Sequence, residues 1–207
     1  MSRGRFITLE GGEGVGKSTQ AKAVAEALRE RGVDVLVTRE PGGSDGAERI
    51  RELLLAGAED RWGARAEALL FAAARADHVD KTIRPALESG RWVLCDRFTD
   101  SSLAYQGGAG GLGIETVRAI NVAAIGDLFP DRTLVLTLDE GAERARARDS
   151  GESDRIGGRS DDYHRKVEAA FRIIAAEEPE RVQLVNASGS PEQVTHRLLD
   201  ALQDLLP

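Results

Sequence analysis

The segment Gly11–Ser18, GGEGVGKS, matches the phosphate-binding pattern G-x-x-x-x-G-K-S/T. With the chain's own 23 glycines, four lysines and 20 serines and threonines, roughly 0.005 matches would arise by chance. The segment follows an apolar, β-rich run and opens a helical pattern, which is the context that such a loop requires. The sequence therefore predicts a phosphate-binding loop, and a glycine-rich turn that merely precedes a helix is a remote alternative.

Each residue type in this loop has a physical role. Gly11, Gly14 and Gly16 allow the backbone to curl so that successive N–H groups point at one anion, and the helix N-terminus adds partial positive charge. Lys17 is expected to reach the β- and γ-phosphates, and the Ser18 hydroxyl is expected to ligate Mg²⁺. The residues predicted to bind ATP are Gly11, Gly12, Glu13, Gly14, Val15, Gly16, Lys17, Ser18 and Thr19. For Thr19, a plain place in the first helical turn is the preferred explanation.

Short apolar runs alternate with helical patterns along the whole chain. The runs are near-continuous, as in strands buried on both faces, and they lie at Arg5–Glu10, Asp34–Thr38, Trp92–Asp96, Thr133–Leu138 and Val182–Asn186. Helical patterns cover Lys17–Arg31, Ala64–Leu87, Ile114–Ile125, Asp161–Glu178 and Glu192–Leu206. This alternation predicts an α/β fold, a parallel sheet with helices on both faces.

We predict a single domain over residues 1–207. The Gly-, Ser- and charge-rich segment Asp149–Asp162 breaks the alternation and is either a disordered loop or part of a mobile lid at about residues 143–160.

Composition restricts the class of protein. A net charge of −7 argues against a chain whose task is to hold a nucleic-acid backbone. No apolar run approaches the ~20 residues that span a bilayer, and the N-terminal MSRGRFITLE lacks the apolar core of a secretory signal. The single cysteine, Cys95, fits a reducing cytosol and is expected to be a buried small hydrophobe. We therefore expect a cytoplasmic protein that binds neither nucleic acid nor membrane.

Charged residues follow two of the predicted strands. Arg39 and Glu40 follow the second strand, and the third strand ends at Asp96, with Arg97 directly after it. Parallel strands bind ligands at their carboxyl ends, so Asp96 is expected beside the Mg²⁺ that accompanies ATP. Its alternative role is a helix cap or turn acid. The predicted metal ligands are Ser18 and Asp96.

Two other classes of nucleotide-binding protein are disfavoured. No lysine follows an asparagine, so the Asn-Lys-x-Asp motif that reads guanine in Ras-type GTPases is absent. The partition and septum-site ATPases, which are nucleotide-switched binding modules, carry a second lysine where this chain has Gly12.

Four stretches in order, LEGGEGVGKST, TREPGG, LLFAAARADHV and CDRFTDSSLAYQGG, closely resemble bacterial thymidylate kinases. The resemblance runs from about Phe6 to Asn186, nearly the whole chain. It implies a P-loop NTPase fold with a five-stranded parallel sheet, a homodimer, and direct transfer of the ATP γ-phosphoryl group to dTMP. The alternatives are a kinase of another nucleoside monophosphate or, less favoured, a nucleotide-switched binding ATPase.

The resemblance also implies roles for single residues. Phe71 would stack on thymine and Arg75 would bond its ring carbonyl, while Tyr105 would crowd the 2′ position of the sugar. Arg51 and Arg97 would hold the acceptor phosphate. The predicted substrate-binding residues are Glu13, Glu40, Arg51, Phe71, Arg75, Arg97, Ser102, Tyr105 and Gln106, and the Asn186–Pro191 loop would line the adenine.

The residues alone leave the base pocket open. Phe71 and Arg75 lie four residues apart and share a helix face, as a planar base with a carbonyl edge requires. The same spacing fits a core phenylalanine and an ion pair between Arg75 and Glu67. The family usually has tyrosine where Phe98 stands, which removes a hydroxyl near Arg97.

The chemistry requires cations rather than a general base, because a phosphate monoester is already largely ionised at pH 7. Where some family members carry a basic residue in the loop, this chain has Gly14, so the resemblance implies that lid arginines supply the charge. Five arginines lie within Glu143–Arg159, and solvated surface pairing would explain about half of them. The predicted catalytic residues are Lys17, Arg97, Arg148 and Arg155.

Overall fold

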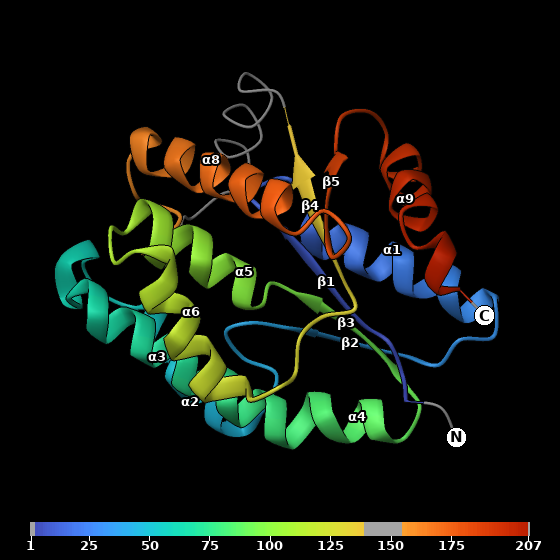
Figure 1. Ribbon diagram of the computed structural model, residues 1–207, viewed down its shortest axis with the longest axis horizontal. Helices are drawn as coiled ribbons and strands as arrows, with labels where there is room; N and C mark the ends of the chain where they lie inside the picture. Colours follow the sequence, from blue (N-terminus) through green and yellow to red (C-terminus); the bar gives the residue numbers. More distant parts are fainter. Residues whose placement is uncertain (1–2, 139–154, 207) are drawn as a thin grey trace.

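The computed structural model describes residues 3–138 and 155–206 (Figure 1). Its centre is a parallel five-stranded sheet with the strand order β2-β3-β1-β4-β5. The strands are β1 (Phe6–Gly11), β2 (Val35–Arg39), β3 (Trp92–Asp96), β4 (Arg132–Thr137) and β5 (Val182–Asn186). The predicted sheet is confirmed, and every strand lies within one residue of its expected bounds.

The register brings the functional stretches together at one edge of the sheet. Asp96, at the end of β3, pairs with Leu9 of β1 on one side and with Arg39 of β2 on the other. The chain leaves β1 at Gly11 and enters the phosphate loop directly. The two stretches that follow β2 and β3 therefore begin beside this loop.

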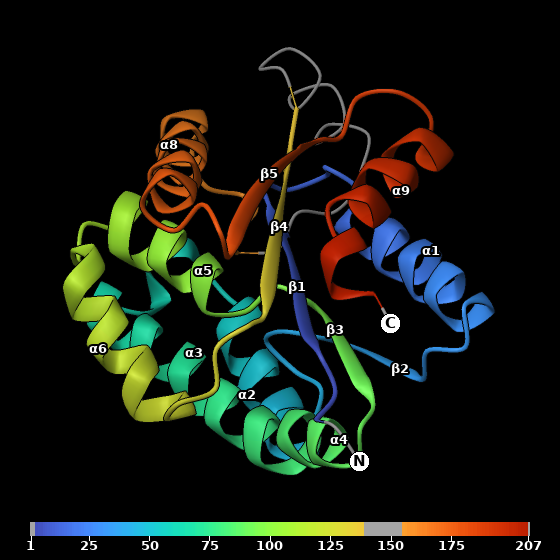
Figure 2. The same cartoon turned by 45° about the vertical axis from the view of Figure 1, so that its right-hand side comes forward.

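Helices cover both faces of the sheet, as expected (Figure 2). On one face lie α1 (Lys17–Glu30) and α9 (Pro191–Asp200), which pack on each other and on the sheet. Residues of α1 that are buried recur with helical spacing, at Ala21, Val24, Ala25 and Leu28. They join the apolar side chains of the strands in the largest core cluster.

The opposite face carries the remaining helices. The sheet is contacted there by α4 (Arg84–Glu88), α5 (Thr99–Ser102) and α8 (Asp161–Glu177). Farther out lie α2 (Asp45–Leu55), α3 (Ala64–His78) and α6 (Ile114–Ile125), of which α3 packs against both of the others. Short turns at Glu59–Arg61 and Gln203–Leu205 are 3₁₀-helical, whereas Val79–Ile83 and Leu103–Ala109 are π-helical.

The helices differ from the sequence prediction in four places, one of which is α5 with the π-helical turn Leu103–Ala109, where no helix was predicted. The α2 helix was not predicted, although Ser44 caps it by accepting a hydrogen bond from the Ala47 N–H. The helix predicted over Ala64–Leu87 widens into a π-turn before Pro85, because proline has no N–H to donate to the preceding turn. The last predicted helix ends early, at Asp200. Most of the predicted lid, residues 143–154, lies outside the described residues.

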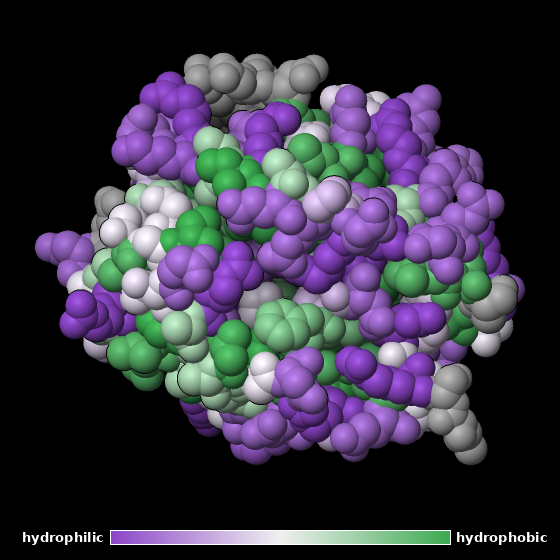
Figure 3. Space-filling model, in the orientation of Figure 1, coloured by the Kyte–Doolittle hydropathy of each residue, from purple (hydrophilic) through white to green (hydrophobic). Residues whose placement is uncertain are grey.

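The surface in Figure 3 is mostly hydrophilic, with hydrophobic residues in separate patches. Within the described ranges, no helix is both long enough and apolar enough to cross a membrane.

Candidate active site

A cavity of about 380 Å³ lies at the carboxyl ends of β1, β2 and β3. The phosphate loop forms one part of its wall, and α2, α3, the segments after β2 and β3, and Ile156 also line it. Among the predicted site residues, those that line it are Glu13, Gly14, Gly16, Lys17, Ser18, Thr19, Glu40, Arg51, Phe71, Arg75, Asp96, Arg97, Ser102, Tyr105 and Gln106. The predicted loop residues Gly11, Gly12 and Val15 do not line it.

The phosphate loop has the backbone conformation that its glycines predict. Gly11, Gly14 and Gly16 have φ angles of 130°, 71° and 95°, a region that other residues rarely adopt. A Cβ atom on Gly11 would also lie 2.4 Å from the Leu136 carbonyl oxygen. The curl therefore depends on glycine at these positions.

Lys17 is buried rather than exposed, contrary to the expectation for a loop cation. Its ammonium group donates to the Gly12 carbonyl oxygen at 2.5 Å and to the Gly11 carbonyl oxygen at 3.3 Å. Burial lowers the pKa of Lys17 to about 8. The loop thus holds its lysine folded back on backbone carbonyls in the wall of the cavity.

This pKa predicts how ATP affinity depends on pH. Phosphates bind the charged ammonium form, which predominates in the free enzyme below pH 8 and is lost above it. The Kd for ATP should therefore rise roughly tenfold between pH 7 and pH 9, because the charged fraction falls about tenfold. Calorimetric titrations at pH 7, 8 and 9 would measure this. The Lys17→Arg variant keeps its charge and should give a nearly flat profile, and an equally flat profile for the wild type would contradict the prediction.

Ser18 and Asp96 meet across the mouth of the loop. The Ser18 hydroxyl donates to Asp96 Oδ2 at 2.6 Å. Both are hard oxygen donors, and a cation that accompanies ATP takes only one or two protein oxygens beside phosphates and water. Among the described residues, no cluster of three or more histidine, cysteine or acidic side chains could hold a metal alone. The pair therefore fits a divalent cation that is shared with a bound nucleotide.

Arg97 stands in the left-handed region of the backbone, with φ 71°, although it is not a glycine. Its backbone is held by a hydrogen bond from its own N–H to the Leu9 carbonyl oxygen at 2.9 Å. Its guanidinium donates to Glu13 at 2.7 Å and lies 5.1 Å from the centre of the Tyr105 ring. The charge of Arg97 lowers the pKa of Glu13 to about 2. Such a conformation at an active-site cation indicates that the surrounding contacts fix its direction.

A buried carboxyl group that the sequence analysis did not single out supports Arg97. Glu10 accepts hydrogen bonds from the Phe98 N–H at 2.7 Å and from the Ser101 hydroxyl at 2.5 Å. The Ser101 oxygen in turn accepts from Arg97 at 3.1 Å. Burial, with the charge of Asp100 nearby, raises the pKa of Glu10 to about 7. An acidic residue inside an apolar strand was the available signal for this group.

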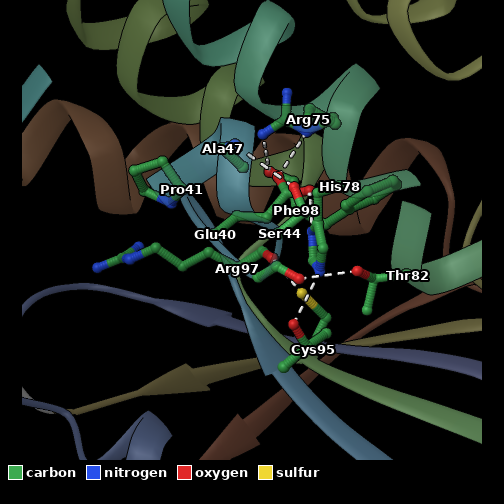
Figure 4. A network of polar contacts seen from close by, with 12 residues as sticks. Glu40, Pro41, Ser44, Ala47, Arg75, His78, Thr82, Cys95, Arg97 and Phe98 are labelled. Atoms are coloured by element: carbon green, nitrogen blue, oxygen red, sulfur yellow. Dashed lines mark hydrogen bonds and ion pairs between the residues drawn. The ribbon is translucent and has the colours of Figure 1, made fainter. Parts of the chain in front are cut away.

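Arg75 is buried and makes four hydrogen bonds, and its contact with Glu40 can be seen in Figure 4. It donates to Glu40 Oε2 at 2.7 Å and to the Phe98 carbonyl oxygen at 3.0 Å. It also donates to Ser102 at 3.0 Å and to Asn121 at 2.5 Å. The alternative ion pair between Arg75 and Glu67 is therefore wrong, since the partner of Arg75 is Glu40. Neither Glu40 nor Asn121 is near Arg75 in sequence.

Phe98 occupies the core beside this network. Its ring packs edge-on against Phe6, with ring centres 4.8 Å apart, and lies 5.3 Å from the Arg75 guanidinium. Only its backbone groups take part in the polar contacts to Glu10 and Arg75. The Phe98 ring, which stands where the family usually has tyrosine, is thus buried in apolar packing.

Arg75→Met should destabilise the fold strongly. The substitution leaves the buried carboxylate of Glu40 without its guanidinium partner, and among the described residues only the His78 side chain, at 3.0 Å, still makes a hydrogen bond to it. Removing one partner of a buried ion pair costs about 3–5 kcal/mol. Urea unfolding would measure the loss. A free energy of unfolding within about 1 kcal/mol of the wild type would contradict this assignment.

The two described lid arginines bind an acidic residue of α3. Arg155 donates to Glu67 at 2.5 Å and Arg159 donates to the same oxygen at 2.7 Å. Arg155 also donates from Nε to the Leu54 carbonyl oxygen at 2.8 Å. Its predicted place at the γ-phosphoryl group stays a prediction, and Arg148 lies outside the described residues.

The loop between β5 and α9 lies against α1. Gln20 donates to the Pro191 carbonyl oxygen at 3.0 Å, and Arg197 donates to the carbonyl oxygens of Asn186 and Ser188 at 2.7 Å each. The loop is therefore held by side chains of both neighbouring helices, and its predicted contact with adenine stays a prediction.

The fold and the cavity together define a class. The cavity combines a phosphate loop that carries a lysine with a hydroxyl–carboxylate pair beside that loop. It also contains Arg51, Arg75 and Arg97. These are the features of a P-loop kinase with a phosphorylated acceptor.

Comparison with known proteins identifies the family. The family model described as thymidylate kinase matches residues 9–198. The chain is 63% identical over 206 residues to the thymidylate kinase of Rhizorhabdus wittichii, covering 99% of each chain. It is 51% identical over 209 residues to that of Bradyrhizobium diazoefficiens, covering 99% of this chain and 92% of the relative. A crystal structure of thymidylate kinase from Ehrlichia chaffeensis aligns with a TM-score of 0.79 at 32% identity, covering 97% of this chain and 99% of that one. The chain belongs to the thymidylate kinase family.

The family confirms the reaction expected from the sequence. The protein is a phosphotransferase that phosphorylates dTMP to dTDP with ATP. The P-loop fold is confirmed by the sheet and by the Ehrlichia structure, and the two alternative functions are not favoured.

Proposed function

We propose that the enzyme transfers the γ-phosphoryl group of a Mg²⁺–ATP complex directly to dTMP within this one cavity. The observation that carries the proposal is the shared wall: Lys17 of the phosphate loop, Phe71 of α3 and Arg97 all line the same cavity. One site can thus hold the donor and the acceptor in line. No covalent enzyme intermediate is required.

Charge neutralisation and positioning carry the reaction. Lys17 would bind the β- and γ-phosphates, and Ser18 and Asp96 would hold the Mg²⁺, which neutralises phosphate charge when bound. Arg97 and Arg51 would orient the phosphate of dTMP, whose oxygen attacks without a general base. Arg148 and Arg155 would add charge at the migrating group.

The acceptor pocket fits a deoxynucleotide. Phe71 is half-buried on α3 and supplies a flat apolar surface for the base. The Tyr105 hydroxyl donates to Glu13 at 3.3 Å, which holds the ring against the side of the pocket. We propose that this ring excludes a 2′-hydroxyl group, and that Glu40 and Ser102 place Arg75 against the edge of the base.

We further propose a cytoplasmic homodimer that does not bind nucleic acid. The net charge of −7 supports the last point, since an acidic surface repels a nucleic-acid backbone. Sedimentation of the purified protein would test the oligomeric state.

A side-by-side assay tests the function. Initial rates with dTMP, dUMP, UMP, CMP and AMP should be highest with dTMP and should vanish when EDTA removes the metal. A higher rate with any ribonucleotide would overturn the choice of acceptor. ATP hydrolysis that does not rise on addition of dTMP would instead favour a nucleotide-switched binding protein.

A further inference from the structure

Glu67 is a buried acidic residue that none of the roles above uses. It lies in the first turn of α3 and is 2% exposed. Its Oε2 atom accepts from Arg155 and Arg159, and its Oε1 atom accepts from the side-chain Nε2 of Gln106 at 3.0 Å. A carboxylate paired with two guanidinium groups accepts hydrogen bonds and donates none.

This arrangement fixes the orientation of the Gln106 amide. The two ends of a glutamine amide differ chemically, because the NH₂ group donates and the oxygen accepts. Only the NH₂ group can face Glu67, so the oxygen must point away from it. Gln106 lines the cavity. Within the described ranges, its Oε1 atom accepts no hydrogen bond. It is also not among the solvent-inaccessible polar atoms that lack a partner, so it is open to the cavity. The amide therefore presents an acceptor to the cavity.

An acceptor at this point selects between pyrimidines. Thymine and uracil carry an N–H group at N3 between two carbonyl groups, whereas cytosine carries an acceptor there. Glu67, Phe71 and Arg75 follow at four-residue intervals on α3 and share one face. The acceptor of Gln106 and the donor of Arg75 thus match a base edge with an N–H group beside a carbonyl. Cytosine would leave both unsatisfied, which is costly in a buried site.

The arginines hold Glu67 itself in place. Arg155 is anchored on the Leu54 carbonyl oxygen, and Arg159 donates to the Tyr163 hydroxyl at 2.6 Å. The Tyr163 hydroxyl donates to the Tyr105 carbonyl oxygen at 2.8 Å, next to Gln106 in the chain. The segment before α8 therefore braces the carboxylate against the base side of the cavity.

We propose that Glu67 is a specificity-determining positioning residue, which locks the Gln106 carbonyl toward the base and thereby selects pyrimidines with an N3–H group over cytosine. This proposal rests on the proposed placement of the base beside Phe71. It assigns Glu67 no contact with the substrate and no part in phosphoryl transfer.

The test is the selectivity of Glu67→Gln. The new amide can donate to the Gln106 oxygen, so that Gln106 can turn and present its NH₂ group to the cavity. The ratio of kcat/KM for dTMP to that for dCMP should fall at least tenfold, with competitive inhibition by dCMP as a second measure. The ratio for dTMP to dUMP should stay unchanged, because both bases carry the N3–H group. An equal loss for all three nucleotides would show a merely structural role and overturn the proposal.

Arg165→Met is the control, since Arg165 lies on α8 and its exposed side chain pairs only with Asp162 among the described residues, at 3.3 Å. Its dTMP-to-dCMP ratio should equal that of the wild type. A double-mutant cycle adds a second check: with Gln106→Met already present, Glu67→Gln should not change the ratio further. A further fall would overturn the proposal, because Glu67 would then act by another route.

A measurement on the wild type decides the matter if Glu67→Gln does not fold. In ¹⁵N-labelled enzyme, the side-chain NH₂ signals of Gln106 should exchange slowly with water and stay in place when dTMP is added. Signals that exchange freely and move on binding would place the NH₂ group against the ligand and overturn the proposal. Turnover of dTMP by the wild type is measured separately, so failure of the function and failure of this inference are distinguishable.

Discussion

Lys17→Ala should abolish phosphoryl transfer and leave a folded protein. Among the described residues, Lys17 is the only lysine that lines the cavity, and we propose that it binds the β- and γ-phosphates. Removing a preorganised donor aimed at transition-state charge costs about 3–4 kcal/mol, or roughly 10²–10³ in kcat. The loss should fall on turnover more than on dTMP affinity, because we propose that the acceptor binds to the other wall of the cavity.

The fold should tolerate this change. Among the described residues, the ammonium group donates hydrogen bonds only to the carbonyl oxygens of Gly11 and Gly12, and carbonyl oxygens at the cavity can be hydrated instead. Lys22→Ala is the matched control, because Lys22 lies on the exposed side of the same helix. Rates and thermal unfolding of both variants would be compared. More than a few per cent of wild-type activity in Lys17→Ala would contradict the phosphate-loop assignment.

Arg97→Met should have the second large effect. Its guanidinium donates two hydrogen bonds to the phosphate loop, to the Gly11 carbonyl oxygen at 3.0 Å and to the Glu13 carboxylate at 2.7 Å. We expect a loss of roughly 10²–10³ in kcat/KM for dTMP, because the acceptor phosphate and the migrating phosphoryl group lose a shared cation. The half-exposed carboxylate of Glu13 would be left to repel the phosphates.

Arg49→Met is the control for Arg97→Met, since Arg49 is an exposed arginine whose side chain pairs only with Glu52 among the described residues, at 3.7 Å. That variant should keep wild-type rates, as surface pairs contribute little. The Kd for dTMP from calorimetry would separate binding from turnover. If Arg97→Met retained wild-type kcat/KM, the acceptor phosphate would have to be bound elsewhere.

The fold was largely predictable because its signals are local. Strands buried on both faces appear as apolar runs such as Trp92–Asp96, and α1 shows helical spacing up to Gly32, whose φ is 82°. The failure to predict one of the helices, α2, has a local cause too. The α2 helix follows the glycine pair at Gly42 and Gly43 and buries only Ala47 and Leu54, so its periodicity is weak.

The site was predictable only where its residues are contiguous or match the family motifs. GGEGVGKS encodes a loop whose backbone binds phosphate by itself, so eight neighbouring residues suffice to predict it. The direction of each side chain was not predictable in this way. Sequence reasoning offered Glu67 as a partner of Arg75, whereas the tertiary packing pairs Arg75 with Glu40 and Glu67 with Arg155.

By itself, then, the sequence determined the sheet, the phosphate loop and the family, because each depends on short-range pattern or on motifs read in order. Only the tertiary structure decided which charges meet. Glu10 reaches Ser101 across 91 positions, Arg75 reaches Asn121 across 46, and Arg155 reaches Glu67 across 88. Such pairs follow from strand register and helix packing, which place distant carboxylates and guanidinium groups together in a water-poor interior where each must find a partner.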